Sequence, residues 1–193
     1  MYARLAELKA YLGLSATEAT DDRLLEALLH RATEAITAYC GRTFEARTET
    51  RYFSHDAKDD EDGALLWVDD DLLTVTALLN GDTAATAITS TYYWLWPRNA
   101  GRFYGIKLKS TFTQGWTWDT DCYVSVTGTW GWSATPPEDV THACVRWAAY
   151  MYQQKDAPVY ETTVFPESGV MSVPIGIPVD VRQLLESHRR RAG

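Results

Sequence analysis

The chain has 193 residues, of which 46% are hydrophobic and 23% charged, a composition typical of a folded globular protein rather than a disordered one. Its formal net charge of −8 excludes a protein that wraps nucleic acid over its whole surface, because phosphate neutralisation requires clustered Lys and Arg. No window approaches about 18 consecutive apolar residues, so we expect no membrane-spanning helix and no membrane partner.

The cysteines are few and widely spaced, at Cys40, Cys122 and Cys144, and none forms a CxxC pair. An odd, scattered set argues against a disulfide framework and against a zinc site. We therefore expect a reducing compartment and no structural metal.

Two helices are predicted at the start of the chain, over 4–12 and 22–40. In each, apolar side chains recur at the spacing of a helix face, and a glycine stands directly after the last residue. Asp21 and Asp22 stand at the start of the second helix, where they supply an N-cap side chain and a negative first turn.

Within 43–133 the helical period gives way to short alternating runs and turn signals, which indicate strands. The three aspartates 69–71 are predicted to form a turn between two strands, and Asn80-Gly81 to form a type I′ hairpin turn. The loop 97–101 is predicted to join two further strands. The strands expected are 48–53, 64–68, 72–79, 92–96, 104–109 and 122–130.

A third helix is predicted over 138–154, directly after two prolines that suit a helix start. An irregular segment, 155–176, contains three prolines, and a final helix is predicted to begin at Pro178. The apolar stripe expected on the third helix is Val140, Cys144, Trp147 and Met151, flanked by Ala143 and Ala148.

These elements predict an α+β protein with a mainly helical frame. A small helical bundle is expected from both chain ends, 1–43 and 134–193, with a large antiparallel β insert over 44–133. The segment after the third helix is expected to be an extended C-terminal arm that leads into the last helix.

No catalytic, metal or cofactor site is predicted. The four histidines form no HxH or HxxxH pair, and the sequence lacks the GxSxG, P-loop and GxGxxG motifs. The acidic loop 56–63 fits a calcium loop poorly, since aligning Gly63 with the EF-hand glycine puts Lys58 at the first ligand position.

The aromatic content is high, with eight Trp and eleven Tyr, most of them between Tyr92 and Tyr160. Such residues fill a small β core, or they present rings to a partner. A carbohydrate-binding β module on a helical base is therefore the alternative hypothesis. It predicts that Trp94, Trp96, Trp116 or Trp118 lie exposed in a row on one face.

Eight segments, none of them a catalytic signature, carry a resemblance to a known family. They are 5–12, 21–22, 39–42, 126–132, 136–140, 148–156, 165–167 and 175–178. Together they resemble the head-tail connector (adaptor) proteins of tailed bacteriophages and related gene transfer agents, and the resemblance covers nearly the full length.

The resemblance implies a structural subunit rather than an enzyme. Such adaptors form rings, typically of twelve subunits, beneath the portal protein of the virion. The ring extends the DNA channel, which DNA crosses without sequence-specific binding, and offers a docking platform to a stopper or other neck or tail protein. The implied location is the head-tail neck of the virion, with assembly in the host cytoplasm.

Two sets of residues are candidates for contacts in such a ring. The arm is expected to bury Val164, Phe165 and Val170 on a neighbouring subunit, since a ring repeats one heterologous interface. The last helix, with its basic end on an acidic protein, is the candidate for docking on the portal. Its candidate residues are Val181, Leu184, Leu185, His188, Arg189, Arg190 and Arg191.

Overall fold

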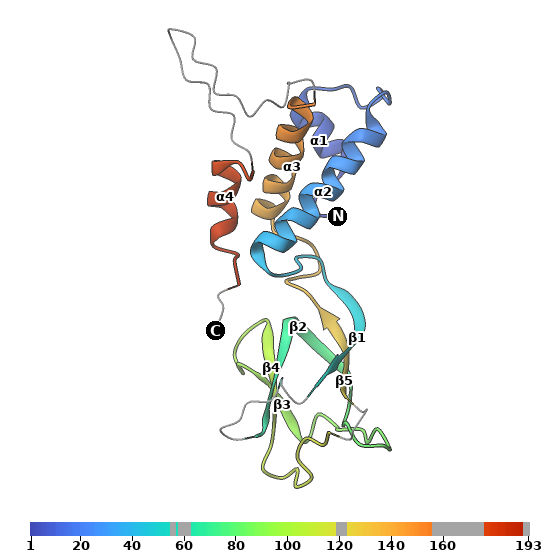
Figure 1. The fold of residues 1–193 in the computed structure, drawn as a ribbon, viewed down its shortest axis with the longest axis vertical. Helices are drawn as coiled ribbons and strands as arrows, with labels where there is room; N and C mark the ends of the chain where they lie inside the picture. The colour runs from blue at the N-terminus through green and yellow to red at the C-terminus, as the bar shows by residue number, and fades with distance from the viewer. Residues whose placement is uncertain (55–56, 58–62, 119–122, 156–175, 191–193) are drawn as a thin grey trace. The chain divides into compact units, whose positions relative to one another are not determined.

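The computed structural model describes residues 1–54, 57, 63–118, 123–155 and 176–190. Within those residues it has four helices and one five-stranded antiparallel sheet, which confirms the predicted α+β class (Figure 1). No helix in this described part of the chain is long and apolar enough to cross a membrane. Cys122 and most of the acidic loop 56–63 lie outside the described residues.

The chain forms two compact units, which we call the helical unit (Met1–Gly41 with Pro136–Gly193) and the β unit (Arg42–Thr135). The helical unit contains all the described helices, and the β unit contains all the described strands. The chain therefore leaves the helical unit after Gly41 and returns to it at Pro136.

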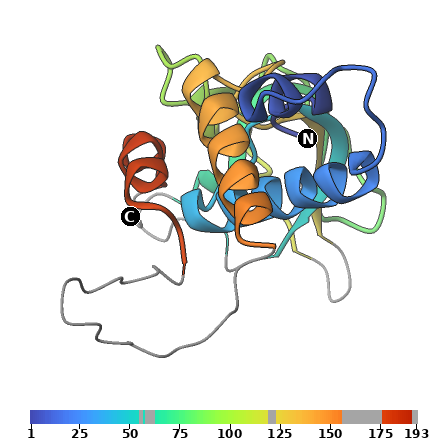
Figure 2. The same cartoon turned by 90° about the horizontal axis from the view of Figure 1, so that it is seen from above.

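In the helical unit, one helix makes the most extensive contacts with the other three (Figure 2). This central helix is α3, and all four begin within one residue of the predicted positions. Gly13 and Gly41 end the first two helices with φ values of 72° and 64°, a left-handed conformation that glycine adopts without a Cβ clash. The helices are α1 (Leu5–Leu12), α2 (Asp22–Cys40), α3 (Glu138–Gln153) and α4 (Val179–Glu186).

The buried side of α3 is broader than the predicted stripe. Val140 and Cys144 are buried as expected. Val145 and Ala149 are buried as well, whereas Trp147 is only half-buried. Three neighbouring helices explain the difference, because a helix with several partners buries a wider arc than a helix with one.

In the β unit, β5 lies between β1 and β2, and all neighbouring strands are antiparallel. The sheet order is β1-β5-β2-β4-β3, so β3 is an edge strand. One face carries a core that includes Leu66, Ile106, Val124, Val126 and Trp130. The strands are β1 (Arg47–Phe53), β2 (Leu65–Leu79), β3 (Tyr93–Trp96), β4 (Phe103–Leu108) and β5 (Val124–Trp130).

The predicted turn at the three aspartates is wrong, because Asp69, Asp70 and Asp71 lie inside the single 15-residue strand β2. Asp70 and Asp71 are also buried, at 6% and 8% exposed. Arginines from outside β2 compensate these buried charges. Acidic residues are depleted in strands, so the sequence pattern alone favoured a turn.

Two arginines neutralise the aspartates of β2. Arg42 Nη1 donates to Asp71 Oδ2 at 3.1 Å. Arg51 donates to Asp69 Oδ1 at 2.7 Å and to Asp70 Oδ2 at 3.3 Å. The strand continues through this acidic stretch because each buried carboxylate has a cationic partner.

The predicted type I′ hairpin at Asn80-Gly81 is also wrong. Asn80 is 1% exposed, and its side chain joins two distant backbone groups, as donor to Gly115 O at 3.1 Å and as acceptor from Thr117 N at 3.0 Å. Gly81 does not have a positive φ. A glycine is needed there because a Cβ would lie 2.3 Å from Thr117 O. By contrast, the hairpin of β3 and β4 around 97–101 is confirmed.

Substitution of Asp71 tests the charge compensation in β2. Asp71→Ala should lower the free energy of unfolding by about 3 kcal/mol, because it leaves the Arg42 side chain, only 13% exposed, without its carboxylate. Asp69→Ala is the matched control and should cost less than about 1 kcal/mol, since the Asp69 side chain is 65% exposed. Urea unfolding followed by circular dichroism measures both, and equal losses would contradict the assignment.

Candidate interaction surfaces

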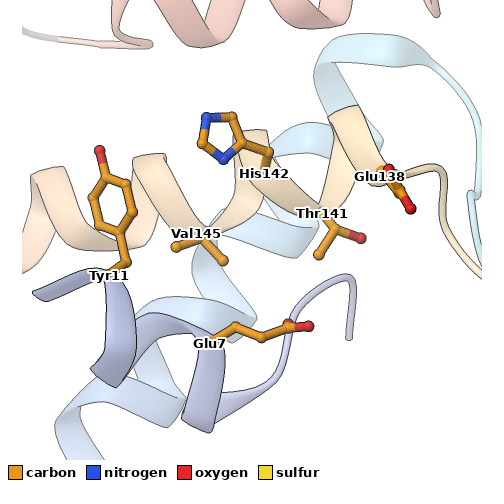
Figure 3. A pocket seen from close by; sticks show the side chains of 6 residues that line it. All are labelled: Glu7, Tyr11, Glu138, Thr141, His142 and Val145. Atoms are coloured by element: carbon orange, nitrogen blue, oxygen red, sulfur yellow. The ribbon is translucent and has the colours of Figure 1, made fainter.

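A groove lies between α1 and α3 in the helical unit. Its side chains recur at helical spacing on both helices, so each helix contributes one wall. Figure 3 shows the side chains of both walls around the hollow. The lining residues are Glu7 and Tyr11 from α1, and Glu138, Thr141, His142 and Val145 from α3.

The groove is acidic, with one aromatic wall. Glu7 Oε2 accepts a hydrogen bond from the backbone N–H of Arg4 at 2.7 Å, which closes the first turn of α1. Among the described residues, no Lys or Arg lies within ion-pair distance of Glu7 or Glu138. The Tyr11 ring is 49% exposed and meets His142 edge-on, with centroids 6.3 Å apart. The groove therefore presents carboxylates and an exposed ring to solvent.

The apolar side of α4 packs within the helical unit. Val181 and Leu185 are fully buried, and Leu184 is half-buried. Burial of these side chains holds α4 against the rest of the helical unit. A docking surface on α4 would therefore have to be built from its exposed residues.

The basic end of α4 is also tied to the helical unit. His188 Nε2 lies 2.6 Å from Asp139 Oδ2, and the backbone N–H of Arg190 donates to Cys40 O at 2.8 Å. Arg189 lies over the Tyr39 ring, 5.1 Å from its centroid, and its side chain is 51% exposed. Arg191 lies outside the described residues, as do Val164, Phe165 and Val170 of the predicted arm.

The end of α3, after which the predicted arm begins, lies beside Asp21. This residue is not the side-chain cap predicted for α2; its carboxylate instead accepts from the Tyr152 hydroxyl and from Lys155 Nζ, the latter at 3.0 Å. The hydrogen bond from Tyr152, followed by that from Lys155, holds the pKa of Asp21 below its ordinary value. The end of α3 is thereby joined to the start of α2.

The hairpin of β3 and β4 carries guanidinium groups stacked on indole rings. Arg98 lies over the Trp94 ring at 4.4 Å from its centroid, and Arg102 over the Trp132 ring at 3.5 Å. Such cation–π contacts hold a guanidinium in place while its N–H edge stays free to donate. Sequence reasoning missed the second pair, because Arg102 and Trp132 are far apart in the chain.

The four tryptophans of the carbohydrate hypothesis do not form an exposed row. Trp116 is 8% exposed, and its Nε1–H donates to Ala64 O at 2.9 Å. Trp94 is covered by Arg98, and of the four only Trp96, at 38%, is a large exposed side chain. We therefore find no stacking platform of the kind that this hypothesis requires.

The described residues contain no group of His, Cys, Asp or Glu arranged to hold a metal ion. Cys40 and Cys144 are buried free thiols. Burial raises the pKa of Cys144 to about 11, only partly offset by a hydrogen bond with Thr33. A thiol so held is protonated and inert near neutral pH.

Comparison with known families connects these surfaces to a class of protein. The model of one family, described as head completion protein, matches residues 3–191. The chain belongs to the head completion protein family. This family is one of structural virion proteins, and the predicted resemblance to phage-like structural proteins is confirmed. No curated protein matches the chain.

Solved structures with a similar fold include chains of gene transfer agent particles. The neck of an empty particle, computed with C6 symmetry, contains a chain with a TM-score of 0.65 and 22% identity. The neck of a native particle, computed with C12 symmetry, contains one with a TM-score of 0.64 and 20% identity. A chain of a native gene transfer agent virion has a TM-score of 0.66 and 21% identity. In each case, 100% of this chain and 91% of the other are covered.

The contact of Asp21 with Tyr152 and Lys155 predicts a pH-dependent stability. Because its folded pKa is lowered, the ionised Asp21 stabilises the fold above its unfolded value of 3.8, and this stabilisation is lost as the pH falls through the folded pKa. Asp21→Asn should therefore be less stable than wild type at pH 7, and the difference should shrink below pH 3.8.

Urea unfolding at a series of pH values measures this difference. The matched control is Glu34→Gln on the exposed side of the same helix, which should leave stability nearly unchanged throughout. A wild-type advantage over Asp21→Asn that grows as the solution is acidified would have the wrong sign and would contradict the assignment.

Proposed function

We propose that this head completion protein is a head-tail connector subunit of a tailed-phage-like particle. In the virion neck it forms a ring under the portal protein, extends the DNA channel, and provides the platform for a stopper or another neck or tail protein. The observation that carries the proposal is the match of the family model to residues 3–191. The full-length fold similarity to chains of gene transfer agent particles supports it.

The two parts of the chain have different roles in the proposed ring. The helical bundle, 1–43 with 134–193, serves as the frame, and the β insert, 44–133, is a module added to that frame. A ring needs one heterologous interface that closes on itself, and the C12 and C6 symmetries of the two related necks support such closure. The arm 155–176 would add to this interface by burying Val164, Phe165 and Val170 on a neighbour.

The charge of the chain suits a passage for DNA. A subunit with a net charge of −8 repels phosphate over most of its surface, so DNA moves through the ring without being held. The basic end of α4 is the candidate contact for the portal, and Arg189 and Arg191 are the residues proposed to make it. Val181 and Leu185 support this contact by holding α4 in place from inside the helical unit.

Light scattering tests ring formation. The chain alone and the chain mixed with its cognate portal protein are compared by mass, starting from the 21.7 kDa of one subunit. A closed ring, free or formed only on the portal, is the expected result. A strict monomer that leaves the portal unbound at high micromolar concentration would contradict the proposed function.

Substitution of two arginines tests the portal contact. Arg189→Ser with Arg191→Ser should weaken binding to the portal about tenfold, since two favourable charge contacts are removed. The matched control is Arg23→Ser with Arg31→Ser, which removes the same charge from the exposed side of α2. Surface binding measurements compare the two variants, and equal affinities would show that α4 does not dock on the portal.

A further inference from the structure

The acidic residues are unevenly distributed along the chain. Of the 26 Asp and Glu residues, none lies between 83 and 118, whereas that segment holds two Arg and two Lys. The segment contains the hairpin of β3 and β4 with its loop 97–101. An acidic protein therefore exposes one hairpin that is basic.

The tip of this hairpin carries a guanidinium group that is positioned to bind an anion. Arg98 is exposed and stacks on Trp94, so the guanidinium is held in place before any partner binds. Among the described residues, no carboxylate lies within ion-pair distance of Arg98. A stacked guanidinium without a carboxylate keeps its donors for a partner group outside the subunit.

Exposed aromatic rings flank the same hairpin. Trp67 on β2 and Trp96 on β3 both pair with Gly105 of β4, which has no side chain between them. Trp67 stacks on Tyr104, with centroids 5.7 Å apart and an angle of 14° between the rings. These three rings are 38% to 42% exposed.

The combination of rings and cations favours a protein partner over duplex DNA. A duplex presents phosphates on its outside and keeps its bases stacked inside, so exposed Trp and Tyr rings would gain little from it. Protein interfaces are instead enriched in Trp, Tyr and Arg, which anchor them near the centre. The partner should therefore present carboxylates and a hollow that admits a hairpin tip.

The helical unit has a hollow of this chemistry. The groove between α1 and α3 carries Glu7 and Glu138 on opposite walls, with the half-exposed ring of Tyr11 one turn of α1 away from Glu7 (Figure 3). The groove is concave and acidic, whereas the hairpin tip is convex and basic. Both surfaces belong to one chain, as a ring built from a single heterologous interface requires.

We infer that the β3–β4 hairpin of one subunit docks in the α1–α3 groove of the next copy. Arg98 meets Glu138 and Glu7, and Trp96 covers the ring of Tyr11. This inference rests on the proposed function, because it assigns the subunit interface of the proposed ring.

Cysteine cross-linking tests the contact directly. In a Cys122→Ser background, Asn99→Cys at the hairpin tip is combined with Thr141→Cys in the groove, and the buried Cys40 and Cys144 are retained. Mild oxidation should give a ladder of covalent oligomers, because every copy offers both partners to its neighbours. Each single variant is a control, as is Asn99→Cys with Ala38→Cys on the exposed side of α2, and these should give no ladder.

Charge reversal tests the same contact without a covalent bond. Arg98→Glu and Glu138→Arg should each weaken ring assembly at least tenfold, and the double variant should recover to within about threefold of wild type. Arg31→Glu, on the exposed side of α2, is the matched control and should assemble normally. Glu7→Arg replaces Glu138→Arg if circular dichroism shows that the latter disturbs the start of α3.

The outcomes separate this inference from the proposed function. Rings that form but give no ladder, or a double variant that assembles no better than the single ones, would overturn the inference and leave the ring intact. Failure of the wild-type chain to assemble, with or without its portal, would overturn both. Normal assembly of Arg98→Glu together with loss of duplex DNA binding would assign the hairpin to DNA and also overturn the inference.

Discussion

The β unit depends on the pairing of buried carboxylates with arginines. The strand β2 continues through Asp70 and Asp71, with a shift of register against β4, because Arg51 and Arg42 neutralise these two carboxylates. Each arginine is also backed by an indole ring: Arg51 lies 4.6 Å from the centroid of Trp130, and Arg42 lies 4.8 Å from that of Trp132. Since β2 pairs with both β4 and β5, this charge compensation holds the two halves of the sheet together.

The helical unit joins segments from both ends of the chain. The end of α2 meets the end of α4, where the Tyr39 hydroxyl donates to Glu186 at 2.8 Å and the Arg190 N–H donates to Cys40 O. The other end of α2 meets the end of α3 through Asp21. The β unit is inserted between these segments of the helical unit, and it has a hydrophobic core of its own.

Charge and shape divide the surface into parts with different roles in the proposed ring. The chain as a whole is acidic, which suits a passage for DNA, whereas the β3–β4 hairpin and the end of α4 each carry a group of basic residues. Two basic sites on separate units can serve two partners. On this view the hairpin serves the neighbouring subunit, and α4 serves the portal.

The sequence alone predicted the family and the helices. The helices could be predicted because helix periods, capping glycines and prolines are local signals, and both ends of α2 were predicted correctly. The β3–β4 hairpin was predicted for the same reason. The course of β2 and the role of Asn80 were decided only by the tertiary structure. Arg42 and Arg51 neutralise aspartates 29 and 18 or 19 residues away, and Asn80 bonds backbone groups 35 and 37 residues away. No local pattern reports such contacts, since a carboxylate in a turn and one paired in a strand look alike until the partner is brought beside it.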